Sequence, residues 1–401
     1  MNTQNKIIVS ILILALLLSG ISVFLAYESY ASSNSIRNAL DSFEKQLFNI
    51  SSQLSSASNS VSAIQSLSST IQSLNLSLTQ KIDQLSSEVS SLKYPIQVYD
   101  ALNRTVFITQ QPQRIVSIAP SITEILFAIN ASSYIVGVDD YSNYPPIIGD
   151  LVKNGTIERV GGFSDISLEK VISLKPDLVI GTTGVQYKFI YQLSQMGITS
   201  ISLRTESIDD IFSATLLLGK ITNHFQDALN LVNELKQRIL GQYSLVASKT
   251  TTRPSIMYVV WINPIFAAGG GSFWNDIIGL SGGRNALENI SQAWPMISWE
   301  EVIKANPDVI VLSEYAGGFS NASQFLSWAR TQPGGESIKA VKDGKVYMLH
   351  GELNDIASRP GPRIAELQLA LSLILHPDLY NVTAVPNDLT LEMVINMTSA
   401  K

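Results

Sequence analysis

The residues of this chain whose types could do chemistry are aromatic more than ionisable. Its three histidines, His224, His350 and His376, are scattered, and it has no cysteine. A transition-metal centre would need several histidines or thiolates grouped with a carboxylate. Disulfides, iron–sulfur clusters and thiol nucleophiles are excluded, and a Gly-x-Ser-x-Gly nucleophile elbow is missing. The sequence therefore predicts a binding protein and not an enzyme, with no cofactor of its own.

Aromatic side chains and prolines gather where strands are expected to end, in places with few charges. Flat apolar faces of this kind suit a large, rigid, planar ligand, although each could also belong to an ordinary core. Arg359 could bind a ligand carboxylate with its fork of donors, or form a salt bridge inside its own lobe. His350 could be an axial metal ligand or only a loop residue. The candidate ligand-binding residues are Tyr141, Tyr144, Phe163, Thr182, Trp261, Phe266, Trp294 and Arg359.

The elements that must position these residues follow an α/β pattern. Arg114–Ala119 is a short apolar run with β-branched residues, typical of a strand. A helix is expected to follow from Pro120, with Ser121 and Glu124 as a capping box. Ile135–Val138 is the next predicted strand, and Asp139–Pro146 is a polar, aromatic loop. Ligands bind at the carboxyl ends of the strands in such βαβ units.

An internal repeat indicates two similar lobes. Ser167–Ile180 reads SLEKVISLKPDLVI and Ser298–Val311 reads SWEEVIKANPDVIV, and the two copies start 131 residues apart. Each is predicted to be a helix that begins after a serine, stops before Pro-Asp and leads into a buried strand. Gly269–Ser272 could hold an anion before a helix or form a tight turn.

Asn223–Ser248 is a long helical pattern interrupted only by Gly241. We expect two Rossmann-like α/β lobes after a transmembrane helix and a coiled-coil stalk. That this single helix joins the lobes is implied by the family resemblance described below. The expected parts are an anchor at 1–28, a stalk at 29–94, lobe one at 95–222, the interlobe helix at 223–248, lobe two at 249–378 and a C-terminal tail at 379–401.

The N-terminus predicts a membrane anchor. Ile7–Ala26 is a run of 20 uncharged residues, and at ~1.5 Å per residue it matches the ~30 Å hydrocarbon core of a bilayer. A cleaved signal peptide is the alternative, but the run is longer than a usual apolar signal segment. We therefore expect a single-pass anchor in the cell membrane, with the rest of the chain outside the cytoplasm.

The serine-rich segment Ser29–Lys93 carries a heptad-like seam. Its apolar residues from Ile36 to Leu92 alternate in spacings of four and three, with one stammer and one stutter, as in a coiled coil. Serine is a mediocre helix former, so partner chains would have to supply stability, which predicts a homo-oligomer. A disordered, glycosylated spacer is the alternative interpretation.

The net charge argues against a nucleic-acid partner, and the glycosylation sequons bear on the location of the protein. The net charge is −6 and the sequence pI is near 5.2, whereas a nucleic-acid partner would need a basic stripe. Sequons without a cysteine for lipid attachment favour a glycoprotein on an archaeal cell surface. The nine Asn-x-Ser/Thr sequons are Asn49, Asn75, Asn103, Asn130, Asn154, Asn289, Asn321, Asn381 and Asn396.

From Arg114 to Pro377 the chain resembles the class III substrate-binding proteins of ABC importers, which carry cobalamin, haem or ferric siderophores. The resemblance rests on the opening βαβ stretch, on YSNYPP, VGGFSDISLE and AWPMISWEE, and on the repeat. It implies two lobes joined by one long helix, with cargo held between them. Phe163 stands where the cobalamin binder has tryptophan, and Thr182 where that protein has a second one, so one stacking surface is missing.

The resemblance also implies a partner. In the family, glutamates at the places of Glu169 and Glu300 pair with arginines on the two permease subunits. The simpler interpretation is stabilisation of two helix N-termini by these carboxylates. The expected function is capture of cobalamin or a ferric siderophore and its delivery to an ABC permease. The alternatives are a haem binder and a surface structural or adhesion protein organised by its coiled coil.

Overall fold

The computed structural model describes residues 94–399, together with Ser42, Glu44–Gln46, Ser73, Leu74 and Ser77. The chain divides into two units, Met1–Val89 and Ser90–Lys401. The expected anchor at 1–28 and most of the expected stalk at 29–94 lie outside the described residues, and the few described stalk residues before Tyr94 are helical. Within the described part of the chain, no helix is long and apolar enough to cross a membrane.

Lobe one is built on a five-stranded parallel sheet in the order β5-β4-β3-β8-β9. The order reverses between β3 and β8, which is the position where doubly wound sheets bind ligands. The strands are β3 (Ile115–Ser117), β4 (Ile135–Val138), β5 (Glu158–Arg159), β8 (Leu178–Thr182) and β9 (Ser200–Leu203). The helices are α4 (Pro120–Ala128), α5 (Ile147–Lys153), α6 (Leu168–Ser173), α7 (Tyr187–Gln195) and α8 (Ile208–Thr222).

Two antiparallel hairpins complete lobe one. The first pairs β1 (Ile96–Tyr99) with β2 (Thr105–Ile108), and the second pairs β6 (Gly161–Gly162) with β7 (Asp165–Ile166). The turn of the second hairpin carries Phe163, so this short ribbon positions one of the candidate aromatic residues.

Lobe two contains a mixed sheet in the order β13-β11-β10-β14-β15-β16, with β12 paired to β10. Its strands are β10 (Ser255–Ile262), β11 (Ile265–Ala267), β12 (Arg284–Asn285), β13 (Met296–Ile297), β14 (Val309–Ser313), β15 (Val346–Leu349) and β16 (Asp388–Leu389). Its helices are α10 (Phe273–Leu280), α11 (Trp299–Ala305), α12 (Ala322–Thr331), α13 (Lys339–Lys342), α14 (Glu352–Ser358), α15 (Ile364–Leu375) and α16 (Leu391–Ser399). The predicted α/β class with parallel sheets is confirmed.

The segment expected as a C-terminal tail, 379–401, contains elements that belong to lobe two. β16 pairs in parallel with β15, and the side chain of Val394 on α16 is fully buried in the lobe-two core. The sequence gives little warning of this, because β16 has only two residues and α16 has only one buried residue.

The internal repeat folds in the same way in both lobes. α6 leads into β8, and α11 leads into β14, each across a short connection. The side-chain oxygen of Ser167 accepts from the backbone N–H of Lys170 at 3.3 Å. Ser298 and Glu301 form a full capping box, in which the Ser298 N–H donates to the Glu301 carboxylate at 2.7 Å. The same local sequence signals therefore produce the same helix and strand in both lobes.

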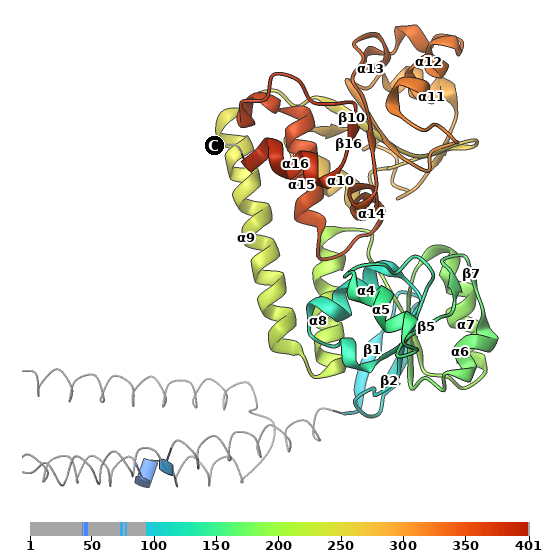
Figure 1. The fold of residues 1–401 in the computed structure, drawn as a ribbon, viewed down its shortest axis with the longest axis vertical. Helices are drawn as coiled ribbons and strands as arrows, with labels where there is room; N and C mark the ends of the chain where they lie inside the picture. The colour runs from blue at the N-terminus through green and yellow to red at the C-terminus, as the bar shows by residue number, and fades with distance from the viewer. Residues whose placement is uncertain (1–41, 43, 47–72, 75–76, 78–93, 400–401) are drawn as a thin grey trace, which may run out of the picture. The chain divides into compact units, whose positions relative to one another are not determined.

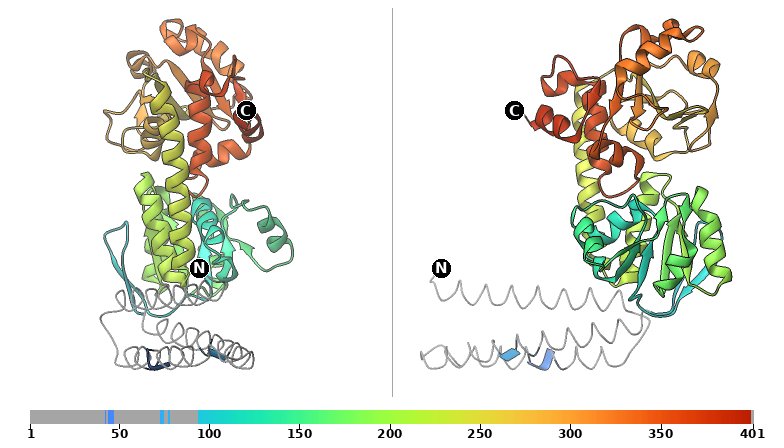
Figure 2. Two further views of the ribbon diagram at one scale, coloured as in Figure 1. Left: turned by 90° about the vertical axis from the view of Figure 1, so that its left-hand side faces the viewer. Right: turned by 45° about the vertical axis from the view of Figure 1, so that its right-hand side comes forward.

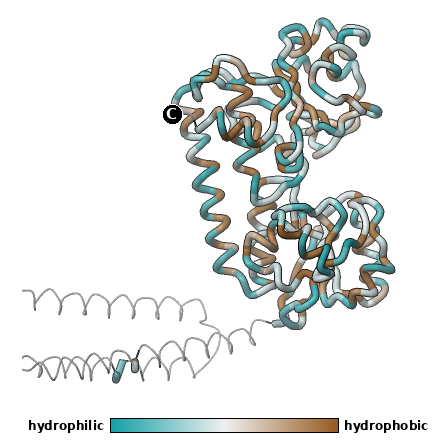
Figure 3. The backbone as a smooth tube through the Cα atoms, in the orientation of Figure 1, coloured by the Kyte–Doolittle hydropathy of each residue, from teal (hydrophilic) through white to brown (hydrophobic). Residues whose placement is uncertain are grey.

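The chain passes from lobe one to lobe two through α9 (Phe225–Lys249), which lies antiparallel beside α8 (Figures 1 and 2). Hydrophilic and hydrophobic residues alternate along α9 (Figure 3), as expected of a helix with one buried face. α8 also reaches both lobes. Its first residues, including Ile211 and Phe212, pack in the lobe-two core, whereas Leu218 and Ile221 pack in the lobe-one core.

The two cores meet between these helices. Leu216 of α8 and Leu231 of α9 are partly buried and pack against both core clusters. A second link comes from Asp276 of α10, whose carboxylate accepts from the backbone N–H of Ile208 at 3.1 Å. The lobes are thus joined by an antiparallel helix pair with a shared apolar seam, although the chain itself crosses only through α9.

Candidate functional site

The carboxyl ends of the strands of the two lobes face each other. Side chains and backbone from α4 and from the loop after β4 contact α14 and the start of α15. The Asn143 amide donates to the Asp355 carboxylate at 3.0 Å, and Arg359 donates to the backbone oxygen of Tyr141 at 3.1 Å. These contacts fix the spacing of the lobes beside the α8–α9 pair.

The centre of this contact is a buried ion cluster around Glu124, whose side chain is 3% exposed. The Arg363 guanidinium donates to both carboxylate oxygens, from Nε at 2.8 Å and from Nη2 at 2.6 Å. Arg359 Nη1 adds a contact at 3.3 Å. The bidentate geometry is the strong form of such a pair. Although burial lowers the pKa of Arg363, hydrogen bonding and charge from Glu124 outweigh it and raise that pKa.

Four further groups contact these two arginines. Arg359 contacts the Asp355 carboxylate at 2.7 Å and the Asn143 side-chain oxygen at 2.6 Å. Arg363 contacts Glu352 at 2.9 Å, and its guanidinium lies 3.8 Å from the centre of the Tyr144 ring. We call Glu124, Asn143, Asp355, Arg359 and Arg363 the interlobe charge cluster.

The cluster changes the interpretation of three residues. Glu124 does not form the predicted capping box: α4 has Ala119 at its N-cap, no side-chain cap and Pro120 at its start. Proline suits this position because its φ is already helical and it has no N–H to leave unpaired. Arg359 pairs with Glu124 of lobe one and also forms the salt bridge to Asp355 inside its own lobe, and one face of the Tyr144 ring is covered by Arg363.

The remaining lobe-one candidates differ in how they are placed. Tyr141 is 59% exposed, and Phe163 is half-buried against the lobe-one core. Thr182 is buried, and its N–H and hydroxyl both donate to the Gln186 side-chain oxygen, at 2.9 and 3.2 Å. Gln186 in turn donates to the Phe163 backbone oxygen at 3.3 Å. Thr182 therefore supports the hairpin that carries Phe163 and offers little surface of its own.

Sequence reasoning missed two lobe-one residues that follow Thr182. Val185 and Tyr187 are 52% and 55% exposed, and they lie in the short turn after β8 and at the start of α7. The sequence signal was the presence of an apolar and an aromatic residue just after a predicted buried strand. In the structure these large side chains are exposed, as expected of a binding surface.

The lobe-two candidates lie on β10, β11 and the loop before β13. Trp261 and Phe266 are cross-strand partners in the β10–β11 hairpin. Trp261 is 43% and Trp294 39% exposed. Trp294 meets Tyr258 and Phe273 edge-on, with ring centroids 6.4 and 6.0 Å apart.

Two further lobe-two residues belong with these aromatics. Tyr315, after β14, is 62% exposed, and Met296, on the edge strand β13, is 65% exposed. Neither stood out in the sequence, because Tyr315 lies in a polar turn and Met296 in a two-residue strand.

Glycines explain why the Trp294 loop lies where it does. Gly269 donates its N–H to the Ala293 oxygen at 2.9 Å, and Gly270 to the Ile290 oxygen at 2.7 Å. A Cβ on Gly270 would stand 2.1 Å from the Glu288 backbone oxygen. The backbones can approach this closely only without side chains. The glycine run is therefore a tight turn, and the N–H groups of Gly269, Gly270 and Ser272 already donate to backbone oxygens.

Both ring nitrogens of His350 lie near carboxylates. One ring nitrogen lies 2.9 Å from the Asp388 carboxylate and the other 3.5 Å from that of Glu314. Across the described residues, no group of three or more histidines and acids could hold a metal ion.

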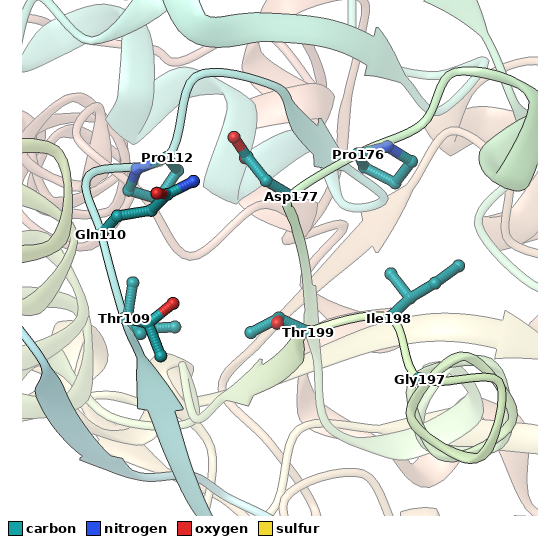
Figure 4. Close-up of a pocket in the computed structure, with 9 residues that line it drawn as sticks. Thr109, Gln110, Pro112, Pro176, Asp177, Gly197, Ile198 and Thr199 are labelled. Carbon is teal, nitrogen blue, oxygen red and sulfur yellow. The ribbon is translucent and has the colours of Figure 1, made fainter.

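A pocket of about 270 Å³ lies elsewhere, below the amino ends of β8 and β9 (Figure 4). Asp177 at its edge accepts backbone N–H groups from Gln113 and Arg114, at 2.7 and 3.0 Å. Because Asp177 thereby fixes the loop that enters β3, we read this pocket as structural. It lies at the sheet edge away from the aromatic residues.

Comparison with known proteins identifies the family. The pattern of the periplasmic binding protein family matches residues 115–353, and the chain belongs to that family. This confirms the resemblance seen in the sequence.

Three relatives illustrate its range. An uncharacterised ABC transporter substrate-binding lipoprotein of Bacillus subtilis (strain 168) is 28% identical over 293 residues, covering 72% of this chain and 87% of the relative. A vitamin B12-binding protein of Vibrio cholerae is 29% identical over 252 residues, covering 63% and 84%. The crystal structure of a possible iron-binding, periplasmic solute-binding protein of Staphylococcus epidermidis aligns with a TM-score of 0.56 and 27% identity, covering 67% and 100%.

Proposed function

We propose that this chain is the substrate-binding protein of an ABC importer and that it holds one large metal chelate between its lobes. The observation that carries the proposal is the set of exposed aromatic side chains on strand ends and loops of both lobes. Tyr141 and Tyr187 belong to lobe one, and Trp261, Trp294 and Tyr315 to lobe two. Large exposed apolar side chains gathered in one place mark a binding surface.

Cobalamin is the preferred cargo, slightly ahead of a ferric siderophore, and haem is the alternative. Relatives named for vitamin B12 and for iron support this order. Thermal-shift screening of the purified ectodomain against cobalamin, haemin and several ferric siderophores tests it, because a ligand that binds the folded state raises apparent stability by mass action. A protein that no chelate stabilises would contradict the proposal.

Trp294→Ala is expected to weaken binding of the preferred chelate by about 2 kcal/mol or more. The reason is that Trp294 presents part of its ring to solvent while Tyr258 and Phe273 hold the rest in place. Isothermal titration measures the loss. Tyr243→Ala is the control, since Tyr243 is similarly exposed at 43% but lies on α9. Equal affinity in the Trp294 variant and the wild type would remove Trp294 from the site.

Permease docking is assigned to Glu169 and Glu300. Both carboxylates are exposed in the first turn of equivalent helices, α6 and α11. Neither has an ion pair or hydrogen bond with another described residue, and Glu301 already serves as the cap partner of Ser298. Two free acids at repeated positions suit pairing with arginines on two permease subunits.

The stalk is proposed to be a parallel coiled coil that holds several copies above the membrane anchor. Ile36–Leu92 would then be about 85 Å long at ~1.5 Å per residue. Sedimentation of a soluble ectodomain starting at Ser29 should show an oligomer, and the same protein starting at Tyr94 should be a monomer. A strictly monomeric longer protein at high concentration would leave the glycosylated spacer as the better interpretation.

A further inference from the structure

The positive charges at the facing strand ends are largely used by the protein itself. Arg159 donates to the backbone oxygens of Asp139 and Ser142. Arg359 and Arg363 are held in the interlobe charge cluster. Guanidinium groups are the usual receptors for acidic groups of a ligand, because they form paired hydrogen bonds with carboxylates. The three guanidinium groups at this site already donate to acceptors of the protein itself.

The carboxylates around Arg359 and Arg363 outnumber the two guanidinium groups. Arg359 and Arg363 together contact three carboxylates, those of Glu124, Asp355 and Glu352. The donors of Arg363 point to Glu124 and Glu352, and those of Arg359 to Glu124, Asn143, Asp355 and the Tyr141 backbone. An acidic cargo group at this wall would have to displace one of these oxygens or lie beside a buried carboxylate.

The remaining charged groups near the strand ends do not reverse this balance. Arg204, after β9, and Lys188, after β8, are exposed and have no ion pair or hydrogen bond among the described residues. Against them stand Asp140, which is exposed after β4, and Glu206, whose carboxylate accepts only the Thr183 hydroxyl, at 3.1 Å, within the described part of the chain. Glu314 lies after β14 and shares His350 with Asp388. Like charges brought together across an interface cost several kcal/mol, so this excess of acids disfavours an anion.

We propose that the cleft selects a metal chelate that is neutral or cationic, and that Glu124 sets this preference by neutralising the arginine pair. The inference rests on the proposed function, since it names the charge class of the cargo held between the same lobes. Such a cleft binds uncharged corrinoids and ferric hydroxamates more tightly than ferric catecholates, haem with its propionates, or oxyanions.

The test compares chelates that share one core and differ in the charge of a single group. One set is cyanocobalamin and its monocarboxylate, in which a single side-chain amide is hydrolysed. The other is a linear ferric trihydroxamate with a free terminal amine, its acetylated form and its succinylated form. Within the set that binds, the anionic member should bind at least about tenfold more weakly than the neutral one. Equal or tighter binding of the anionic member would overturn the inference and leave the importer function standing. Failure of every chelate, haemin and ferric catecholate included, would overturn both.

The role of Glu124 is tested by Glu124→Gln, which keeps an oxygen for Arg363 and removes the charge. The ratio of neutral to anionic affinity should fall at least about fivefold, because the freed guanidinium charge can then serve the cargo. Glu352→Gln is the matched control: it contacts the same Arg363, but its side chain is 48% exposed, so the ratio should change much less.

Circular dichroism at the assay temperature shows whether the Glu124 variant is folded. Where it is not, Asp355→Asn removes another carboxylate from Arg359, and the same fall in the ratio is expected. A folded Glu124→Gln or Asp355→Asn protein with the wild-type ratio would show that the cluster does not set the charge preference.

Discussion

Glu124→Ala is expected to lower the free energy of unfolding by about 3–5 kcal/mol, the usual cost of removing one partner from a buried ion pair. Two guanidinium groups, those of Arg359 and Arg363, would lose their shared carboxylate while their own side chains remain only 9% and 10% exposed. Urea unfolding followed by tryptophan fluorescence measures the change. Its midpoint should fall while its slope stays near the wild-type value.

Glu352→Ala provides the comparison, since it removes a carboxylate at 2.9 Å from the same Arg363 but from a side chain that is 48% exposed. Exposed pairs contribute about 0–1 kcal/mol, so this variant should remain close to the wild type. If the two substitutions lower the free energy of unfolding equally, Glu124 contributes no more than an exposed partner does. The interlobe charge cluster then does not hold the lobes together.

Replacing both Glu169 and Glu300 with alanine is expected to leave chelate affinity unchanged and to abolish uptake. The two side chains lie on α6 and α11 and are not among the proposed ligand-binding residues, so their loss removes no proposed ligand contact. Each first-turn carboxylate contributes only about 0.3–1 kcal/mol to its helix, which the folded protein can lose. Transport into proteoliposomes that contain the cognate permease, beside ligand titration of the purified variant, separates the two effects.

The matched control exchanges Glu158 and Glu336 for alanine, because these acids are also exposed, one on each lobe, but lie outside the repeated helices. It should transport normally. Glutamate-to-arginine changes at 169 and 300 should restore part of the transport by a permease whose docking arginines are reversed to acids. Normal uptake by the alanine pair would reduce Glu169 and Glu300 to helix stabilisers.

The sequence predicted those elements whose signals are local. β4 spans Ile135–Val138, with the predicted bounds, and β3 (Ile115–Ser117) lies within the predicted strand Arg114–Ala119. In each, apolar residues fill one continuous segment with clear ends, so propensity and burial agree. The repeat added the lobe architecture, because the same capping serine, Pro-Asp stop and buried strand occur twice.

What the sequence could not supply was the identity of distant partners. Ser121 and Glu124 satisfy the spacing of a capping box, yet Glu124 pairs with arginines 235 and 239 positions away. A local rule has no access to such contacts. One hint was present: Glu124 is the one charged residue in a largely apolar helix, and a buried charge needs a partner of opposite charge. Short pairings such as β13 and β16 were missed because two residues carry no periodicity.

The packing of α8 has a consequence for how the molecule holds together as a whole. Ile211 and Phe212 precede the crossover in α9, yet their side chains complete the core of the second half. A cut after Thr222 would therefore leave the first half with apolar residues in water and the second half with a hole. The two halves of this duplicated architecture have become mutually dependent, and cooperative unfolding in a single step is the behaviour that such a shared core imposes.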